Sequence, residues 1–597
     1  MFLPLLLLVP LFAAMIAIAL LRPSMKYGYI ASAASLASLL LLYFVQNGSI
    51  TITWFTIGKD AIAITTTIAP LNMALLAIVF FIGTLIHLYS TGYLKTLSEQ
   101  KRFYIEMLAF EIAMATFAMS GNFILLFIAW EFLSMLSYML IGFWHNRERA
   151  VRAARLAITT VLIGDIALIA AIVIFWNTFG TFNFATILSL MPHSVSIGLL
   201  AGSALLLLAI FTKSAQFPFQ EWLPEAMEGP TPVSAFLHSS TMVKAGVFAA
   251  IILFPIFAAA HLLALMLWFG VLTAIIATFN AMREKQVKRV IAYSTVQELS
   301  LMLVAVASGA LIAAIYFFIV QSFYKALLFF SSGSVMHATE EESIDKIRGM
   351  SSNKLLYIST LFGVLSVAGM IPFSGFFASA AIGSSVFTNL IVYSLIILIG
   401  LGTSFFIFRW FFMISGPDKA GETALRYKAL PRAMIYPAVL LAALTLAGSS
   451  IFFLIPGFLS SSPAFITGAP QLSVSLLDIV SVTVLFAVGA AVSYSLYKPS
   501  RLLKPSQKKG SALASLAYTH KFFMLLYGGA ARFVYEISEG VGAFDLYLSE
   551  AFDWLGHAVV LASRGIRRMS VGGINPYAFV FAVGFAVLLA WIFLVIV

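Results

Sequence analysis

Long apolar stretches follow one another along almost the whole chain and are separated by short polar or turn-rich joints. Most of them reach the length of about 20 residues that a helix needs to cross the hydrocarbon core of a bilayer. We therefore expect an all-α polytopic membrane protein. The pattern predicts about sixteen membrane-spanning helices, at 1–21, 27–46, 70–91, 104–120, 122–143, 154–176, 195–217, 231–254, 261–281, 288–307, 309–335, 355–385, 389–415, 432–457, 471–497 and 574–597.

The same pattern divides the chain into parts of different character. Within the first part, residues 49–68 alternate Thr and Ile around Gly58, which is typical of a short external β-hairpin. We expect, in this order, N-terminal helices with the hairpin, a first repeat, a second repeat, additional helices, a lateral amphipathic helix and a C-terminal anchoring helix, at 1–103, 104–254, 261–416, 432–497, 511–568 and 574–597.

Lysine and arginine gather in alternate joints, as they do on the cytoplasmic side of membrane proteins. This bias predicts that the N-terminus and the C-terminus both lie outside. The first apolar stretch has no basic residue before it and is followed by Arg22 and Lys26, so we expect a retained helix and no cleaved signal peptide. The other basic joints lie at 95–102, 147–155, 283–289, 346–354, 419–432 and 498–509.

The composition excludes several classes of protein. With 61% hydrophobic and 10% charged residues, the chain is too apolar for a soluble core. The net charge of +11 follows from the basic joints, so it does not indicate binding of nucleic acid. The chain has no cysteine, which excludes thiolate-bound iron–sulfur clusters, and it has neither a Walker loop nor a GxGxxG motif. Any redox chemistry is therefore expected in a partner.

The stretch from Leu205 to Phe248 has the most unusual polar pattern in the chain. Lys213, His238 and Lys244 fall at depths where a membrane span should carry no charge. Pro218 follows Lys213 by five residues and cannot donate to the helix ladder, so a helix break is expected close to the lysine. A broken helix with a buried cation is typical of transport proteins.

Two carboxylates also fall inside predicted spans. Glu131 lies near the middle of the span 122–143, and Asp165 lies in the next span. Because an isolated carboxylate in hydrocarbon is costly, such a residue indicates function. The alternative for Glu131 is a carboxyl that stays neutral or that pairs structurally with a polar neighbour.

The chain also resembles itself. Residues 128–140 (IAWEFLSMLSYML) match residues 291–303 (IAYSTVQELSLML) at an offset of 163. The breaks expected at Pro218 and Pro372 recur at a comparable offset. The repetition predicts two five-helix repeats, each with a proline-broken helix, and an odd number of helices makes the second repeat inverted.

The segment 515–568 is too polar to span a membrane. Its apolar positions from Phe533 to Val559 recur at steps of three and four residues and define one face of a helix. About 50 helical residues would reach roughly 75 to 80 Å, much more than a bilayer, so we expect the helix to lie along the membrane. The alternative is one or two ordinary surface helices.

Four motifs occur in order along the chain: WEFLSMLSYMLIGF, KSAQFPFQEWLPEAMEGPTPVSAFLHSSTMVKAG, RVIAYSTVQELSLM and YKALLFFSSGSVMHA. Together they closely resemble the largest antiporter-like (L-type) subunit of respiratory complex I, the NADH-quinone oxidoreductase. The same motifs resemble its relatives, which are Mrp-type cation/proton antiporters, membrane-bound hydrogenases and archaeal deazaflavin-dependent dehydrogenases. The segment 511–568 resembles the long lateral helix that, in complex I, runs from the L-type protein along the neighbouring subunits.

The resemblance implies roles for individual residues. Glu131 and Lys213 would form the ion pair of the first channel, with His238 continuing the proton path, and Lys325 would be the central lysine of the second repeat. Such a lysine releases its proton when the carboxylate is moved away or neutralised. Lys244 is an additional candidate, and Asp165 is a weaker one; for Lys244 the alternative is a lysine that snorkels or pairs structurally.

Two positions depart from the pattern of the family. Where the second broken helix of the family carries an ionisable residue, this chain has Ser379 and Ala380. The histidine of the family one turn before the central lysine is replaced by Gln321. If the second repeat conducts protons, its outward exit depends on the hydroxyls of Ser374 and Ser379 and on water. The alternative is that this exit is lost and that translocation depends on the first repeat, with His238 and Lys244.

The sequence therefore predicts a proton-translocating subunit of a complex I-type respiratory complex. The chain would be a non-redox subunit of a quinone oxidoreductase in a prokaryotic plasma membrane. Quinone, iron–sulfur clusters and a flavin or other electron-input cofactor would belong to partner subunits, which the lateral helix would contact. The alternative is a component of an Mrp-type antiporter, moving protons or Na⁺ without electron transfer.

Overall fold

The computed structural model describes residues 3–22, 26–57, 60–94, 97–191, 195–416, 422–463, 466, 468, 472 and 474–497. All of them belong to one structural unit, Met1–Ser506. The lateral helix 511–568 and the anchoring helix 574–597 expected from the sequence lie outside the described residues, so both stay predictions.

The N-terminal part consists of helices and one hairpin. Strands β1 and β2 pair in antiparallel fashion, with Gly48 opposite Ile68, which confirms the hairpin predicted from the Thr/Ile alternation. The elements are α1 (Leu3–Leu6), α2 (Val9–Leu20), α3 (Tyr27–Leu41), η1 (Leu42–Phe44), β1 (Gly48–Ile57), β2 (Asp60–Ile68), α4 (Pro70–Tyr93) and α5 (Leu97–Ala118).

The next part contains the first broken helix. Its elements are α6 (Phe123–Ile141), α7 (Glu148–Phe179), α8 (Phe184–Ser189), α9 (Ile197–Lys213), α10 (Trp222–Glu225), η2 (Ala226–Glu228), α11 (Thr231–Ser239) and α12 (Met242–Ile252).

The remaining described part contains the second broken helix. Its elements are α13 (Phe254–Ala259), α14 (Leu263–Arg283), α15 (Val287–Ala307), α16 (Leu311–Thr339), η3 (Met350–Ser352), α17 (Lys354–Val367), α18 (Ser374–Ser385), α19 (Leu390–Ser415), α20 (Glu422–Lys428), α21 (Arg432–Phe458), η4 (Leu459–Ser461) and α23 (Leu476–Tyr497).

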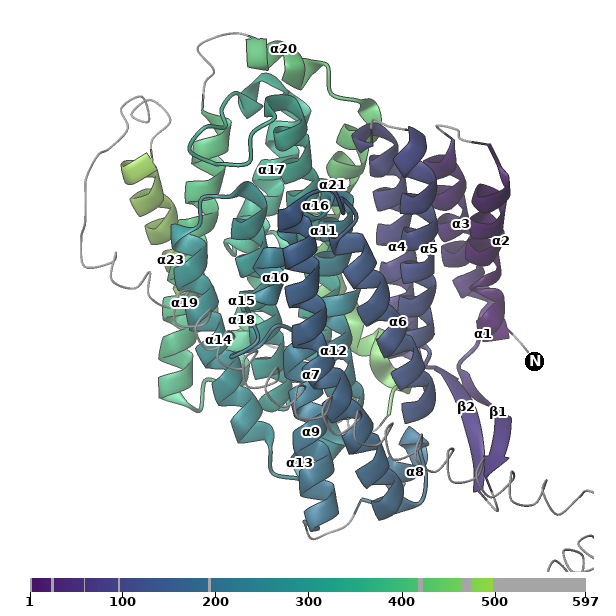
Figure 1. Cartoon of the computed structure of the whole chain (residues 1–597). Helices are drawn as coiled ribbons and strands as arrows, with labels where there is room; N and C mark the ends of the chain where they lie inside the picture. Colours follow the sequence, from purple (N-terminus) through teal and green to yellow (C-terminus); the bar gives the residue numbers. More distant parts are fainter. Residues whose placement is uncertain are drawn as a thin grey trace, which may run out of the picture. The chain divides into compact units, whose positions relative to one another are not determined.

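Within the described residues, 11 helices are long and apolar enough to cross a membrane, and three shorter apolar helices accompany them. The polytopic helical architecture is therefore present (Figure 1). The total of about sixteen spans and the two inverted repeats remain predictions. Figure 1 also shows α20 and the hairpin β1–β2 at opposite ends of the bundle.

Several helices begin at a side chain that caps the first turn. Asn122 accepts a hydrogen bond from the backbone of Leu125 at the start of α6, and Ser196 does the same for Leu199 at the start of α9. These caps satisfy backbone donors that a helix start leaves open, which matters most where no water is at hand.

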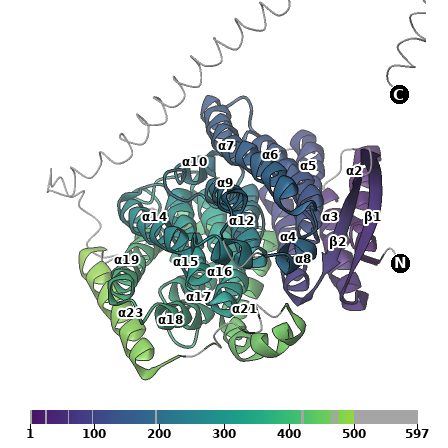
Figure 2. The ribbon, with the colours of Figure 1, turned by 90° about the horizontal axis from the view of Figure 1, so that it is seen from below.

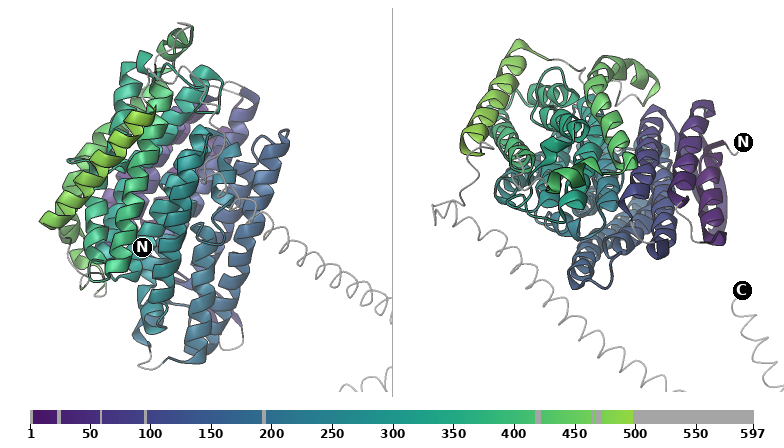
Figure 3. Two further views of the ribbon diagram at one scale, coloured as in Figure 1. Left: turned by 90° about the vertical axis from the view of Figure 1, so that its left-hand side faces the viewer. Right: turned by 90° about the horizontal axis from the view of Figure 1, so that it is seen from above.

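Helix α16 lies at the centre of the bundle. Figure 2 shows it surrounded by α12, α15, α17 and α21, and every residue from Leu311 to Val335 is buried. A helix that is buried all round makes no contact with lipid, so its polar side chains face other helices. At the edge of the bundle, α23 packs on α19 (Figure 3).

The chain is not helical around either proline. Helix α9 ends at Lys213, and α10 begins only at Trp222, whose indole nitrogen donates to the backbone oxygen of Thr212 at 2.9 Å. The predicted span 355–385 likewise divides into α17 and α18, with Pro372 in the gap. Each break leaves backbone N–H and C=O groups without their helical hydrogen bonds, and inside a membrane these groups need other hydrogen-bond partners, such as the Trp222 indole.

The predicted single span 231–254 is also divided, which the sequence analysis did not anticipate. Helix α11 ends at Ser239, and α12 starts at Met242. The hydroxyl of Thr241 donates to the backbone oxygen of Phe236 at 2.7 Å, and that of Ser239 donates to Ala235 at 2.5 Å. Such side-chain hydrogen bonds compete with the helix ladder and permit the break.

Candidate functional site

Lys213 lies at the C-terminal end of α9 with no exposed surface. Its ammonium donates to the backbone oxygen of Trp130 at 3.0 Å and to the hydroxyl of Ser134 at 2.5 Å. The same nitrogen lies 4.6 Å from the centre of the Trp130 ring. Carbonyl, hydroxyl and aromatic face together form a cradle on α6 that stabilises a buried cation.

Asp165 of α7 supplies a carboxylate beside Lys213. Its Oδ1 lies 3.9 Å from the lysine nitrogen and accepts a hydrogen bond from the Trp130 indole at 2.7 Å. Its Oδ2 accepts one from Ser134 at 3.0 Å. Asp165 is therefore fixed in place by the same two residues that hold the lysine.

The ion pair between Glu131 and Lys213 that the resemblance implies is not formed in the described structure. Among the described residues, the carboxylate within 4.0 Å of Lys213 is that of Asp165. Glu131 directly follows Trp130 and precedes Ser134 by three positions on α6, so it borders the face that holds the lysine without coming within 4.0 Å of it. Glu131 is partly buried, and its Oε1 has no hydrogen-bond partner among the described residues.

Lys244 occupies a second cradle of the same design. Its nitrogen donates to the backbone oxygen of Phe318 and to the hydroxyl of Ser322, both at 2.5 Å, and lies 4.5 Å from the centre of the Phe318 ring. An aromatic residue and a serine four positions later hold the lysine, as in the first cradle. Lys244 has no exposed surface, so it does not snorkel to the lipid headgroups.

Lys325 of α16 pairs with Glu298 of α15. The distance from its nitrogen to Glu298 Oε1 is 3.2 Å, and it donates to the hydroxyl of Ser294 at 2.5 Å. Glu298 is not among the residues predicted from the sequence. The signal was present, because this carboxylate falls in the middle of an apolar span, as Glu131 does.

His238 lies on α11 with no exposed surface, and within the described part of the chain neither of its ring nitrogens has a hydrogen-bond partner. Its ring centre lies 4.8 Å from that of Phe329 on α16. Phe329 follows Lys325 by four positions and therefore lies on the same face of α16.

Lys325 and the residues that contact Lys244 and His238 thus form one stripe on α16. Its positions, 318, 322, 325 and 329, are spaced by four, three and four residues, which is the spacing of one helix face. The stripe is about 16 Å long at 1.5 Å per residue. Helix α16 therefore aligns three of the predicted proton-transfer residues.

A further buried cluster lies outside the two predicted channels. Glu111 of α5 accepts a hydrogen bond from Ser35 of α3 at 2.9 Å and pairs with His87 of α4 at 3.0 Å. All three side chains have no exposed surface. Glu111 is not among the functional residues predicted from the sequence.

The site as a whole offers buried ammonium, carboxylate, imidazole and hydroxyl groups, which are the chemistry of proton transfer. In the described part of the chain, no group of three or more His, Asp or Glu side chains is placed to hold a metal ion.

Comparison with protein families gives two matches. The family described as "NADH:quinone oxidoreductase/Mrp antiporter, TM" matches residues 120–407. The family described as "NADH-Ubiquinone oxidoreductase (complex I), chain 5 N-terminus" matches residues 54–104. The first range includes all six of the predicted proton-transfer residues.

The chain is similar to proteins of two kinds of complex. It is 29% identical over 565 residues to NADH-quinone oxidoreductase subunit L of Mycobacterium tuberculosis, covering 91% of this chain and 88% of that protein. It is 35% identical over 365 residues to a Na⁺/H⁺ antiporter protein of Alkalihalophilus pseudofirmus, covering 56% of this chain and 45% of that protein. A chain of the Mrp complex from a Dietzia species has a similar fold, with a TM-score of 0.73, 23% identity, and coverage of 88% and 59%.

Proposed function

Because the chain belongs to the family of antiporter-like membrane subunits of NADH:quinone oxidoreductases and Mrp antiporters, we propose that it translocates protons as the L-type subunit of a complex I-type respiratory complex. The observation that carries the proposal is the set of three buried lysines, each held by a serine hydroxyl on a neighbouring helix. Burying one charge is costly, and burying three in one bundle indicates a function.

In the first half, Lys213 is the proton carrier and Asp165 is its partner. While the carboxylate is close, the ammonium form is stabilised, and a shift of α7 or α9 would favour release of the proton. Glu131, with a carboxylate oxygen that no described residue hydrogen-bonds, would then exchange protons with Lys213 through water.

In the middle of the bundle, the proton passes between Lys244, His238 and Lys325 along the stripe on α16. His238 can relay a proton. Neither of its ring nitrogens is hydrogen-bonded to a described residue, so the imidazole can accept a proton on one nitrogen and release a proton from the other. Glu298 is the partner of Lys325, as Asp165 is the partner of Lys213.

Electron transfer in partner subunits would drive these movements, and quinone, iron–sulfur clusters and a flavin or other electron-input group would be bound there. The chain itself would be a non-redox subunit of a translocating quinone oxidoreductase. The predicted lateral helix 511–568 would contact the neighbouring membrane subunits. We place the chain in a prokaryotic plasma membrane with both termini outside, which the basic joints support.

The second candidate is a role within an Mrp-type antiporter, which exchanges protons for a cation such as Na⁺ without electron transfer. The identity of 35% to the Na⁺/H⁺ antiporter protein favours it. The coverage favours complex I, because the chain spans 88% of subunit L and only 45% of the antiporter protein.

The test is to purify the complex from its native membranes by an affinity tag on this chain. The proposal expects iron–sulfur and quinone-binding subunits, together with reduction of quinone by NADH, reduced ferredoxin or a reduced deazaflavin. In sealed vesicles the same reaction should move protons. Co-purification of small antiporter subunits alone, with no quinone reduction by any of these donors, would establish the second candidate instead.

A further inference from the structure

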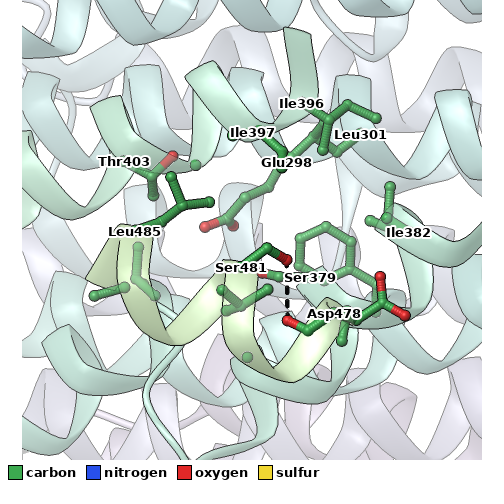
Figure 4. A pocket seen from close by; sticks show the side chains of 18 of the residues that line it. Glu298, Leu301, Ser379, Ile382, Ile396, Ile397, Thr403, Asp478, Ser481 and Leu485 are labelled. Atoms are coloured by element: carbon green, nitrogen blue, oxygen red, sulfur yellow. Dashed lines mark hydrogen bonds between the residues drawn. The ribbon is translucent and has the colours of Figure 1, made fainter. Parts of the chain in front are cut away.

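A cavity lies beside the Lys325–Glu298 pair, between α15, α18, α19 and α23 (Figure 4). Its volume is about 70 Å³, which is room for several water molecules, since one needs roughly 10 to 15 Å³ by the same measure. Its polar lining includes Gln297, Glu298, Ser379, Tyr393, Asp478 and Ser481.

Three polar atoms of residues that line the cavity have no hydrogen-bond partner within the described part of the protein. They are Glu298 Oε2, Gln297 Oε1 and the hydroxyl of Tyr393. Buried polar atoms are almost always satisfied, so atoms left open around a cavity indicate that water hydrogen-bonds to them. Glu298 thus has one oxygen on Lys325 and the other without a hydrogen-bond partner within the described part of the protein.

Asp478 lines the other side of the same cavity, and Figure 4 shows it across from Glu298. It comes from the first turn of α23 and is only 2% exposed. Its Oδ2 accepts hydrogen bonds from the backbone and the hydroxyl of Ser475, at 3.0 and 2.6 Å. The hydroxyl of Ser475 accepts a hydrogen bond from the backbone of Asp478 at 3.1 Å, so the two residues form a capping box at the start of α23 that occupies Oδ2.

The second oxygen of Asp478 faces α18. A methyl group built on Gly383 would lie 3.4 Å from Asp478 Oδ1, so no side chain of α18 fills the space between them at this position. Helix α18 itself carries no ionisable residue. The carboxylate of α23 therefore lies on the cavity that α18 borders with Ser379 and Ala380.

The position of Asp478 along its helix indicates the direction of transfer. Helix α23 begins beside Asp478 and ends at Tyr497, just before the basic joint 498–509. Since basic joints mark the cytoplasmic side, Asp478 lies towards the outer side. Glu298 lies eleven residues, about 16 Å, from the start of α15, whose first turns carry Lys288 and Arg289.

We propose that Asp478 of α23 is the outward proton acceptor of the second repeat, reached from Glu298 through water in this cavity. The proposal rests on the proposed function. In the first step an N–H bond of the Lys325 ammonium breaks, and an O–H bond forms on Glu298. Glu298 then gives its proton to a cavity water, which gives one of its protons to the Asp478 carboxylate. The water is regenerated, and Lys325 is reprotonated from the side of His238 and Lys244.

The test measures protons moved per quinone reduced in sealed vesicles that contain the whole complex. Asp478→Asn keeps an oxygen for the Ser475 hydrogen bonds and cannot take up a proton near neutral pH. We expect a clearly lower ratio, with recovery in Asp478→Glu. Ser475→Ala is the matched control, because it weakens the cap and retains the carboxylate, and its ratio should stay normal.

A rescue variant makes the test specific. In the Asp478→Asn background, Ser379→Asp returns a carboxylate to the same cavity from α18, and the ratio should recover. A normal ratio in Asp478→Asn would overturn the proposal, while a lowered ratio in Lys325→Ala would leave the proposed function standing. A normal ratio in both Asp478→Asn and Lys325→Ala would also show that the second repeat takes no part in proton translocation.

A second variant serves if Asp478→Asn does not assemble. Gly383→Leu fills the space in front of Asp478 and leaves the carboxylate and Ser475 unchanged. An assembled complex with a lowered ratio would support the proposal. An assembled complex with a normal ratio would overturn it.

Discussion

The hydroxyl of Ser214 donates a hydrogen bond to the backbone oxygen of Val243 at 2.9 Å. Ser214 directly follows Lys213, and Val243 directly precedes Lys244. The contact therefore joins the end of α9 to the first turn of α12 and couples the positions of two buried lysines. A movement of the first lysine that accompanies proton release would be transmitted to the second through this contact.

The junction of α9 and α12 also depends on Gly246. A methyl group at this position would lie 2.2 Å from the Ser214 hydroxyl and 2.9 Å from the backbone oxygen of Ile210. We expect Gly246→Ala to lower the stability of the complex by about 1 to 3 kcal/mol through overpacking. The measurement is the midpoint of thermal unfolding of the solubilised complex.

The matched control for this prediction is Gly457→Ala on α21, where a methyl group meets no described atom within 4 Å. An equal loss of stability in both variants would show that close packing at Gly246 is not the cause.

The two carboxylates near Lys213 should differ in importance. Asp165→Asn retains one of the two oxygens that accept hydrogen bonds from Trp130 and Ser134, and it removes the charge that faces the lysine. We expect proton translocation in vesicles to fall by about 100-fold, which is the lower end of the range for loss of an acid–base group. The fall should be at least as large as in Glu131→Gln. If the Asp165→Asn variant translocates protons normally and the Glu131→Gln variant does not, Glu131 is the functional partner of Lys213.

Lys244 should be needed for transfer between the two halves. Lys244→Ala removes the titratable group from the cradle of Phe318 and Ser322, so we expect translocation to fall about as far as in Lys213→Ala. Ser322→Ala keeps the lysine, its carbonyl and its aromatic contact, and should have the smaller effect. An assembled Lys244→Ala complex that translocates normally would show that Lys244 has only a structural role.

The cluster of Glu111, His87 and Ser35 should stabilise the N-terminal helices. Glu111→Ala leaves the imidazole and the hydroxyl without their partner in a buried site, at a cost of roughly 1 to 3 kcal/mol for each unsatisfied group. We expect lower yields of assembled complex and a lower unfolding temperature. Glu148→Ala is the control, because its ion pair with Arg152 is exposed and contributes little. Equal stability of both variants would contradict this role.

The predicted lateral helix can be tested by truncation before Ser511. A long apolar face buried on partner subunits contributes in proportion to its area, so its loss should release the chain from the complex. Native gel electrophoresis of solubilised membranes would show a smaller complex. If the truncated chain still forms the full complex, the lateral segment is not required for assembly.

The sequence determined the membrane fold and most long helices. The predicted spans 389–415 and 288–307 match α19 and α15 within one residue at each end, because the thickness of the bilayer fixes how long an apolar stretch must be. The break near Lys213 was also predictable, since proline cannot continue a helix. The break between α11 and α12 was not, because serine hydroxyls make the same hydrogen bonds to the backbone inside unbroken helices, as Ser203 and Ser300 do.

The tertiary structure alone decided which groups meet. The angular position of each residue on its helix, and the helices that pack beside it, put Asp165, and not Glu131, within 4.0 Å of Lys213. Asp478 reaches its cavity because α23 packs against α18, a contact between segments that are about 100 residues apart in the sequence. The periodicity of a sequence determines the face of one helix, whereas the packing of several helices determines the pairs of residues that come into contact.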